Sequence, residues 1–241
     1  EFGYINLENS TLDRYEEIHG LFTQYADTVE QEDDWWDKLY VRTATEESIL
    51  IMKSLEEGTY SVCWPNREDG ALVYDETYIY GPNNYLGYEK IVYDKEGQCL
   101  SQYYETPEKT QEITWTYGYI TYRKTVTTIK ETGKVMWEES KTLPDGSSYP
   151  LRQENDNLIR EYTYTFEDSG ILLTYYAYSS YYDEEVLWTF DGNGPYGEDY
   201  TSHVVGLVRT FEGVTTTYTK DQIPWGSGML YPPRNDIELG Q

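Results

Sequence analysis

The sequence predicts a mainly β protein, an antiparallel meander of about ten strands preceded by one N-terminal α-helix. Three observations support this class. From residue 59 the hydrophobic pattern repeats every second residue, and turn sequences containing glycine separate the alternating runs. The third is composition: 28 of the 241 residues are Tyr, a side chain that fits a pleated, half-buried surface. We therefore expect tyrosine side chains to cover much of the two faces of the sheet.

The opening segment, residues 9–30, is predicted to be helical. Apolar side chains recur there at spacings of three and four, which places them on one stripe: Leu12, Tyr15, Ile18, Phe22, Tyr25 and Val29. Gly20 weakens the middle of this helix by about 1 kcal/mol relative to Ala. The acidic run that begins at Glu30 ends the pattern.

Residues 43–57 allow two interpretations. Thr43 and Glu46 fit a helix capping box, with Gly58 just past the helix end. Alternatively, the apolar run 49–52 is a short buried strand that leads into the strand beginning at Thr59. We favour the strand, because the following sequence alternates as a strand does.

Residues 59–223 are predicted to form the meander. Trp115, Tyr117 and Tyr119 alternate with smaller residues, and acidic turns with glycine recur between such runs, as at 94–97 and 144–146. A barrel, a sandwich and one extended twisted sheet all remain open. Residues 224–241 are predicted to be a C-terminal loop. Because no linker of Pro or Ser repeats divides the chain, we expect a single domain spanning 1–241.

Two segments share a hairpin pattern. Tyr93-Asp94-Lys95-Glu96-Gly97 precedes a Tyr pair at 103–104, and Phe166-Glu167-Asp168-Ser169-Gly170 precedes one at 175–176. The pattern resembles the Tyr-Asp hairpin repeats of bacterial secreted and surface proteins. The spacing here is irregular, and the Arg often found after the turn glycine is missing. The resemblance implies a mainly non-catalytic scaffold.

The strongly negative net charge limits which molecules the chain can bind. The chain has 44 Asp and Glu against 18 Lys and Arg, a formal net charge of −26. Such a field repels phosphate backbones and anionic lipids, so we expect neither nucleic-acid binding nor membrane-surface binding through a basic face. No apolar run reaches the roughly 18 residues that a membrane-spanning helix needs. The acidic, Tyr- and Thr-rich, Cys-poor composition is typical of exported bacterial proteins, so we expect a secreted or cell-surface location.

Few residues carry recognisable chemistry. The two cysteines, Cys63 and Cys99, either form a disulfide, worth about 4 kcal/mol on the chain-entropy model, or remain free thiols. With two Cys and two His there is no zinc-ligand spacing. No phosphate-binding loop, dinucleotide fingerprint or serine-nucleophile elbow is present. We expect no cofactor other than calcium.

One loop could hold calcium. Asp191, Asn193, Glu198 and Asp199 supply hard oxygen donors around two glycines. The spacing does not match an EF-hand, because position six is Tyr196 and no Glu stands at position twelve. A plain hairpin turn is the competing interpretation.

The favoured function is that of a non-catalytic, exported binding or structural module. Recognition of a glycan or a protein surface would run through exposed aromatic side chains, and the candidates in or near loops are Trp35, Trp36, Tyr80, Tyr85 and Tyr181. One alternative is a glycan-active enzyme, because paired carboxylates beside aromatic rings suit sugar hydrolysis. Two such groups occur in the sequence: Asp33, Asp34, Trp35, Trp36 and Asp37, and Tyr181, Tyr182, Asp183, Glu184 and Glu185. Another alternative is a closed barrel that binds a small apolar ligand.

Overall fold

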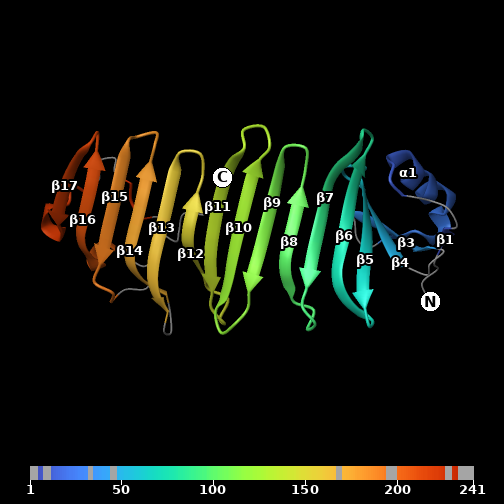
Figure 1. The fold of residues 1–241 in the computed structure, drawn as a ribbon, viewed down its shortest axis with the longest axis horizontal. Helices are drawn as coiled ribbons and strands as arrows, with labels where there is room; N and C mark the ends of the chain where they lie inside the picture. The colour runs from blue at the N-terminus through green and yellow to red at the C-terminus, as the bar shows by residue number, and fades with distance from the viewer. Residues whose placement is uncertain are drawn as a thin grey trace. The chain divides into compact units, whose positions relative to one another are not determined.

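The chain folds into an antiparallel β meander with one helix near its N-terminus, as the sequence predicts (Figure 1). The computed structural model describes residues 5–7, 12–31, 35–43, 48–166, 170–193, 200–225 and 230–232. In chain order the described elements are β1 (Ile5–Leu7), α1 (Tyr15–Gln24), the 3₁₀ helix η1 (Ala26–Thr28), β2 (Glu30–Gln31), β3 (Trp36–Thr43), β4 (Ser48–Ser54), β5 (Tyr60–Glu68), β6 (Ala71–Gly81), β7 (Asn84–Tyr93), β8 (Cys99–Glu105), β9 (Lys109–Thr116), β10 (Thr121–Ile129), β11 (Lys134–Thr142), β12 (Ser148–Glu154), β13 (Leu158–Phe166), β14 (Gly170–Ser179), β15 (Glu184–Phe190), η2 (Tyr200–His203), β16 (Val204–Phe211), β17 (Val214–Thr219) and η3 (Lys220–Gln222).

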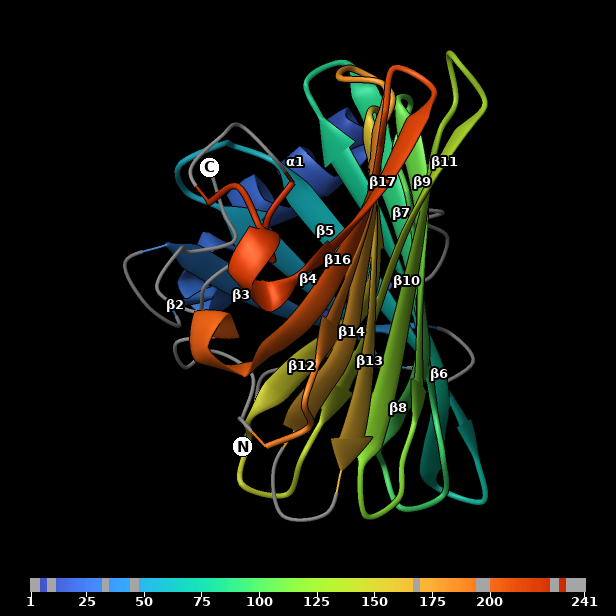
Figure 2. The ribbon, with the colours of Figure 1, turned by 90° about the vertical axis from the view of Figure 1, so that its left-hand side faces the viewer.

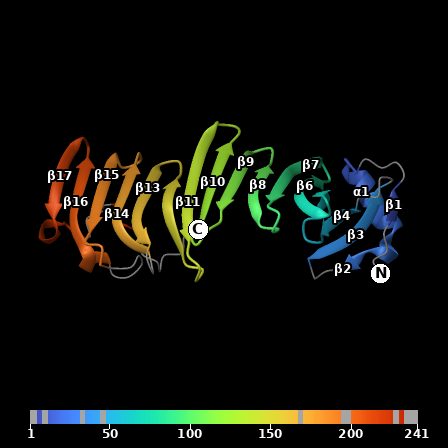
Figure 3. The same cartoon turned by 60° about the horizontal axis from the view of Figure 1, so that its bottom comes forward.

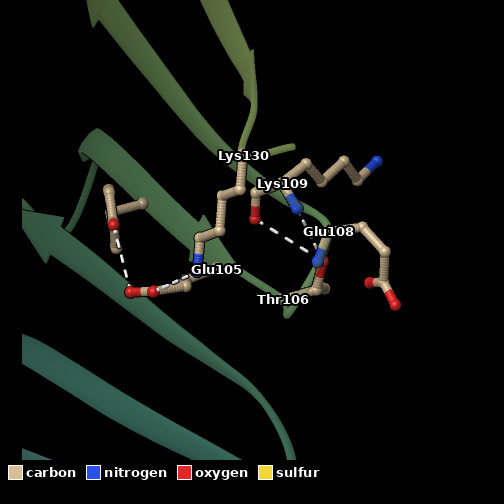
Figure 4. A network of polar contacts seen from close by, with 6 residues as sticks. Glu105, Thr106, Glu108, Lys109 and Lys130 are labelled. Atoms are coloured by element: carbon tan, nitrogen blue, oxygen red, sulfur yellow. Dashed lines mark hydrogen bonds and ion pairs between the residues drawn. The ribbon is translucent and has the colours of Figure 1, made fainter. Parts of the chain in front are cut away.

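The described part contains 17 strands, more than the ten expected. Each strand from β2 to β9, and each strand from β11 to β17, is hydrogen-bonded to its neighbours within that run, and β1 runs parallel to β3, with Ile5 opposite Val41. The low count arose partly from turns that use no glycine. Between β8 and β9, the Thr106 hydroxyl accepts hydrogen bonds from the backbone N–H groups of Glu108 and Lys109, at 3.3 and 3.2 Å (Figure 4). A threonine that closes a turn in this way is a weaker sequence signal than Gly.

Where glycine does form the turn, the prediction is confirmed. Gly97 and Gly146 both have positive φ, at 84° and 88°, a region that glycine enters without steric cost. Before Gly97, the Asp94 side chain accepts hydrogen bonds from the backbone N–H groups of Glu96 and Gln98. The acidic residue and the glycine therefore act together to reverse the chain.

Both predicted boundaries at the N-terminal end were wrong. Of the expected helix 9–30, residues 9–11 lie outside the described residues; in the described remainder the helix covers Tyr15–Gln24 and is followed by η1 and the short strand β2. The meander begins well before residue 59, since β3 and β4 are strands paired with each other. The strand interpretation of residues 49–52 is confirmed: Ile49 and Ile51 are buried, whereas Leu50 and Met52 on the opposite face are only half-buried.

The chain divides into two compact units. Unit 1 comprises Glu1–Thr114 and Thr127–Lys134, and unit 2 comprises Trp115–Val126 and Val135–Gln241. Within unit 1 the described ladders run from β1 and β2 to β9, and within unit 2 from β11 to β17, without returning to their first strands. Each unit is therefore an open sheet and not a barrel. The single-domain expectation stays a prediction.

The core of unit 1 lies between α1 and the first strands of the sheet (Figures 2 and 3). Ile18 and Phe22 of the helix are buried against side chains that alternate along β3 to β6: Leu39, Val41, Ile49, Ile51, Tyr60, Val62 and Tyr80. We name this side of the sheet the helix face of unit 1. The helix stripe predicted from the spacing therefore packs as expected.

The core of unit 2 is built around Trp188. Its ring is fully buried, packs against Trp225 and Tyr231 at centroid distances of 5.6 and 5.5 Å, and donates a hydrogen bond to the backbone oxygen of Leu230. The described part of the C-terminal loop thus lies across the sheet of this unit. The buried side chains that complete the cluster are Tyr162, Leu172, Tyr175, Ala177, Val186, Phe190, Val204, Leu207 and Ile223.

Candidate functional site

A pocket of about 290 Å³ lies in unit 1 and combines aromatic rings with a carboxylate and an amide. We name it the aromatic pocket. Its volume is close to the lower end of the range found for small-ligand sites. Its lining comes from β4, β5 and β6: Ser48, Ile49, Trp64, Pro65, Asn66, Tyr74, Glu76 and Tyr78.

Strand pairing explains why these side chains meet. Trp64 of β5 lies opposite Glu76 of β6, and Asn66 lies opposite Tyr74. Since side chains two residues apart in a strand point to the same face, Trp64 and Asn66 share a face with Glu76 and Tyr74. Trp64 and Tyr78 also pack against the core beneath α1, which places the pocket on the helix face.

Glu76 is the central polar group of the pocket. Its carboxylate accepts a hydrogen bond of 2.6 Å from the hydroxyl of Tyr88 and lies 3.5 Å from the Lys90 ammonium group. That ammonium also lies 3.9 Å from the ring centroid of Tyr74, within cation–π range. The carboxylate is therefore charge-compensated and held in place, with further lone pairs able to accept hydrogen bonds from a ligand.

The tyrosines around Glu76 keep their protons well above neutral pH. Burial, followed by the hydrogen bond to Glu76, raises the pKa of the Tyr88 hydroxyl far above its ordinary value. Burial and the nearby Glu76 charge likewise raise the pKa of Tyr78. Both hydroxyls are thus neutral donors, and the surface beside the pocket carries no tyrosinate charge.

Aromatic rings continue across the strands away from the pocket. The ring centroids of Tyr78 and Tyr88 are 5.1 Å apart, and those of Tyr88 and Tyr103 are 6.2 Å apart. Tyr103 donates a hydrogen bond to Glu105. Glu105 in turn pairs with Lys130 (Figure 4). These contacts, led by the bond from Lys130, lower the pKa of Glu105. The series of tyrosine contacts therefore ends at the ion pair between Glu105 and Lys130, and not at an unpaired carboxylate.

The structure does not bring the predicted contact residues together. Trp35 is 58% exposed and Trp36 is half-buried in β3, whereas Tyr181, 75% exposed, belongs to unit 2. Tyr80 and Tyr85 are cross-strand partners at the β6–β7 turn, and Tyr85 is 45% exposed. Tyr80, however, is only 6% exposed and belongs to the core, where burial raises its pKa to about 12. Its proposed role in ligand contact was wrong.

The predicted calcium loop is described only in part, since Glu198 and Asp199 lie outside the described residues. Asp191 accepts hydrogen bonds from the backbone N–H of Asn193 at 2.9 Å and from the His203 ring at 3.2 Å. These contacts, the bond from Asn193 foremost, lower the pKa of Asp191. Its described contacts are those of a turn, and among the described residues no group of three His, Cys, Asp or Glu is placed to hold a metal ion. Calcium binding stays a prediction.

Neither Cys63 nor Cys99 is part of a disulfide, so the disulfide alternative was wrong. Cys63 lies on β5 and Cys99 on β8, three strand spacings apart. At about 4.8 Å per spacing this is about 14 Å, well beyond the roughly 7 Å that a disulfide can span between Cα atoms. Burial raises the pKa of both thiols, which favours the protonated, less reactive form.

Sequence reasoning missed the residues that line the aromatic pocket. Tyr74, Glu76 and Tyr78 occur at alternate positions in one strand, which is a signal for a shared face. Nothing in the sequence shows that Trp64 lies across from Glu76, because that depends on the register between β5 and β6.

The chain matches no protein-family model, no curated protein and no solved structure. In the part of the chain that is described, α1 is the longest helix, and none has the length and apolar character required to cross a membrane.

Proposed function

We propose that the chain is a non-catalytic, exported β-sheet module that binds a neutral glycan at the aromatic pocket. The observation that carries this proposal is the lining itself, in which Trp64, Tyr74 and Tyr78 surround Glu76 and Asn66. Flat aromatic faces stack on the apolar faces of sugar rings, while an amide and a carboxylate satisfy sugar hydroxyls. Secretion or cell-surface display is part of the proposal, in keeping with the acidic, Tyr-rich composition.

The electrostatics favour a neutral ligand. The charge of Glu76 is compensated by Lys90, so a cationic ligand would have to compete with that ion pair. An anionic ligand would have to approach a chain with a formal net charge of −26. A polyhydroxylated neutral ligand neither competes with the ion pair between Glu76 and Lys90 nor is repelled by the net negative charge.

Binding is favoured over hydrolysis by the number of carboxylates. A glycosidase needs two carboxyl groups that face the same bond at about 5–10 Å. Among the residues that line the aromatic pocket, Glu76 is the one carboxylate. A single carboxylate that is held in place by Tyr88 and Lys90 can act as a hydrogen-bond acceptor for a bound ligand.

The test is a glycan array probed with the full chain, with and without calcium, followed by titration of the glycans that bind. Trp64→Ala and Glu76→Gln are expected to weaken binding about tenfold or more, as the loss of a stacked ring or of a charged acceptor typically does. Trp35→Ala is the matched control, since Trp35 is exposed outside this pocket. Thermal melting checks that each variant is folded.

Two results would contradict the proposal. One is that the array shows no binding to any glycan, either with or without calcium. The other is binding that survives Trp64→Ala and Glu76→Gln but is lost in Trp35→Ala, which would move the site to the loop aromatics predicted from the sequence.

A further inference from the structure

Unit 2 contains a second pocket of different chemistry, with a volume of about 320 Å³. We name it the polar pocket. It has no aromatic lining. Its residues come from β10, β11 and β12: Arg123, Thr125, Glu138, Glu139, Ser140, Ser148, Pro150, Arg152 and Gln153.

A β-bulge lies at this pocket. In the β11–β12 ladder Glu139 pairs with Arg152, but the next residue, Ser140, pairs with Pro150, so Leu151 is an extra residue in β12. A bulge bends its strand and redirects the neighbouring side chains. The extra residue lies in β12, so β11 keeps its alternation, and Glu138 and Ser140 share one face with their ladder partners Gln153 and Pro150. Glu139 and its partner Arg152 lie on the other face, where the Arg152 guanidinium is 5.0 Å from the centroid of the Trp137 ring.

Unsatisfied polar atoms gather at the same place. Arg152 Nε and Gln153 Oε1 are buried without a hydrogen-bond partner, as is Nε of Arg160, which lies opposite Gln153 in the ladder. The terminal nitrogens of Arg152 are already paired with Glu154 and Glu161, at 3.0 and 3.2 Å. A buried donor and a buried acceptor left unpaired are costly, and in a native protein they call for a ligand or an ordered water.

The lining also includes one unpaired cation and one unpaired anion. Glu139 accepts a hydrogen bond from Tyr122, and Arg152 is paired as above. Arg123 and Glu138 are exposed, and neither has a hydrogen bond or ion pair with any residue that the structure describes. They lie on β10 and β11, so the pocket presents opposite charges on two strands.

We propose that the polar pocket binds a free α-amino acid. The guanidinium of Arg123 receives the carboxylate of the ligand, and Glu138 together with the buried Oε1 atom of Gln153, its partner across the ladder, receives the ammonium group. Arg123 and Glu138 present one charge of each sign, so a simple anion also meets Glu138 and a simple cation also meets Arg123. A zwitterion pairs with both signs at once. This site is independent of the aromatic pocket in unit 1.

The test uses the full chain and a mixture of the common L-amino acids, observed by saturation-transfer NMR, with titration calorimetry of each one that binds. At least one amino acid is expected to bind. Its N-acetyl derivative lacks the ammonium group and its methyl ester lacks the carboxylate, so each is expected to bind at least about tenfold more weakly. Arg123→Gln and Glu138→Gln are expected to lose affinity by a similar factor.

The control is Arg67→Gln in unit 1, where the Arg67 side chain is exposed and donates to the backbone oxygen of Gly70. It is expected to bind as the unchanged chain does. Absence of binding up to about 10 mM, well above a millimolar Kd, would overturn the proposal. So would binding that is unaffected by both charge-removing variants or by both derivatives. Circular dichroism confirms that the variants are folded, which their exposed positions lead us to expect.

Discussion

Alkaline pH is expected to destabilise unit 1 through Tyr60. This side chain is 1% exposed, and its hydroxyl lies 2.7 Å from the Nδ1 atom of His19 on α1. Its ring packs against Tyr15 and Phe22 at centroid distances of 5.3 and 5.1 Å. Burial, followed by the nearby Tyr15 and Asp37, raises the pKa of Tyr60 from 10.0 to about 12.

The sign of the effect follows from the direction of that change. A raised pKa means that folding favours the protonated hydroxyl, so the stabilisation is fully present below pH 10 and is lost as the pH rises to about 12. The difference between the two pKa values corresponds to about 3 kcal/mol in total. At pH 11, midway between them, about half of that stabilisation is lost.

The assay is urea unfolding at pH 9 and pH 11 of the unchanged chain, of Tyr60→Phe and of the control Tyr119→Phe, which alters a side chain that is 78% exposed. Tyr60→Phe is expected to be less stable at pH 9 by about 1 kcal/mol, because the bond to His19 is lost. Between pH 9 and pH 11 it should lose less stability than the other two proteins, by about 1 kcal/mol or slightly more. Equal losses in all three would refute the argument.

Three further changes test other parts of the fold. Arg209→Met leaves the carboxylate of Glu184, 1% exposed and bonded to Arg209 at 2.6 Å, buried without its partner, and we expect calorimetry to show a loss of about 3–5 kcal/mol. Gly20→Ala adds a Cβ atom with nothing within 4 Å, and we expect urea unfolding to show that α1 is stabilised by about 1 kcal/mol. Gly87→Ala places a Cβ atom 2.8 Å from a backbone oxygen of β8, and we expect it to lower the melting temperature. Trp188→Ala should cost about 3–5 kcal/mol and abolish most of the near-UV circular dichroism of unit 2; retention of that signal would contradict its central place in the core.

Local patterns were enough to predict the fold class. The spacing of Ile18 and Phe22 identified the helix stripe, and the turn glycines such as Gly97 identified hairpins. The strand count fell short where turns rely on other residues, as at Thr106. The predicted helix was too long at its C-terminal end, because acidic residues occur both in the helix and in the short elements that follow it.

The candidate sites could not be predicted in the same way. Trp64 and Glu76 are 12 positions apart in the sequence, and Thr125 and Gln153 are 28 apart; strand pairing brings each set to one pocket. The bulge at Ser140 is likewise invisible without its partner strand. Separation across several strands also explains why Cys63 and Cys99 do not meet.

The sequence by itself determined the antiparallel β class, the apolar stripe of the helix, the turns that use glycine, and the net charge of −26. These properties depend on nearest neighbours and on total charge, both of which are present in the linear order of residues. Only the tertiary structure decided which side chains face each other, because cross-strand register is set by the hydrogen-bonded ladders and changes the face of every residue when it slips by one.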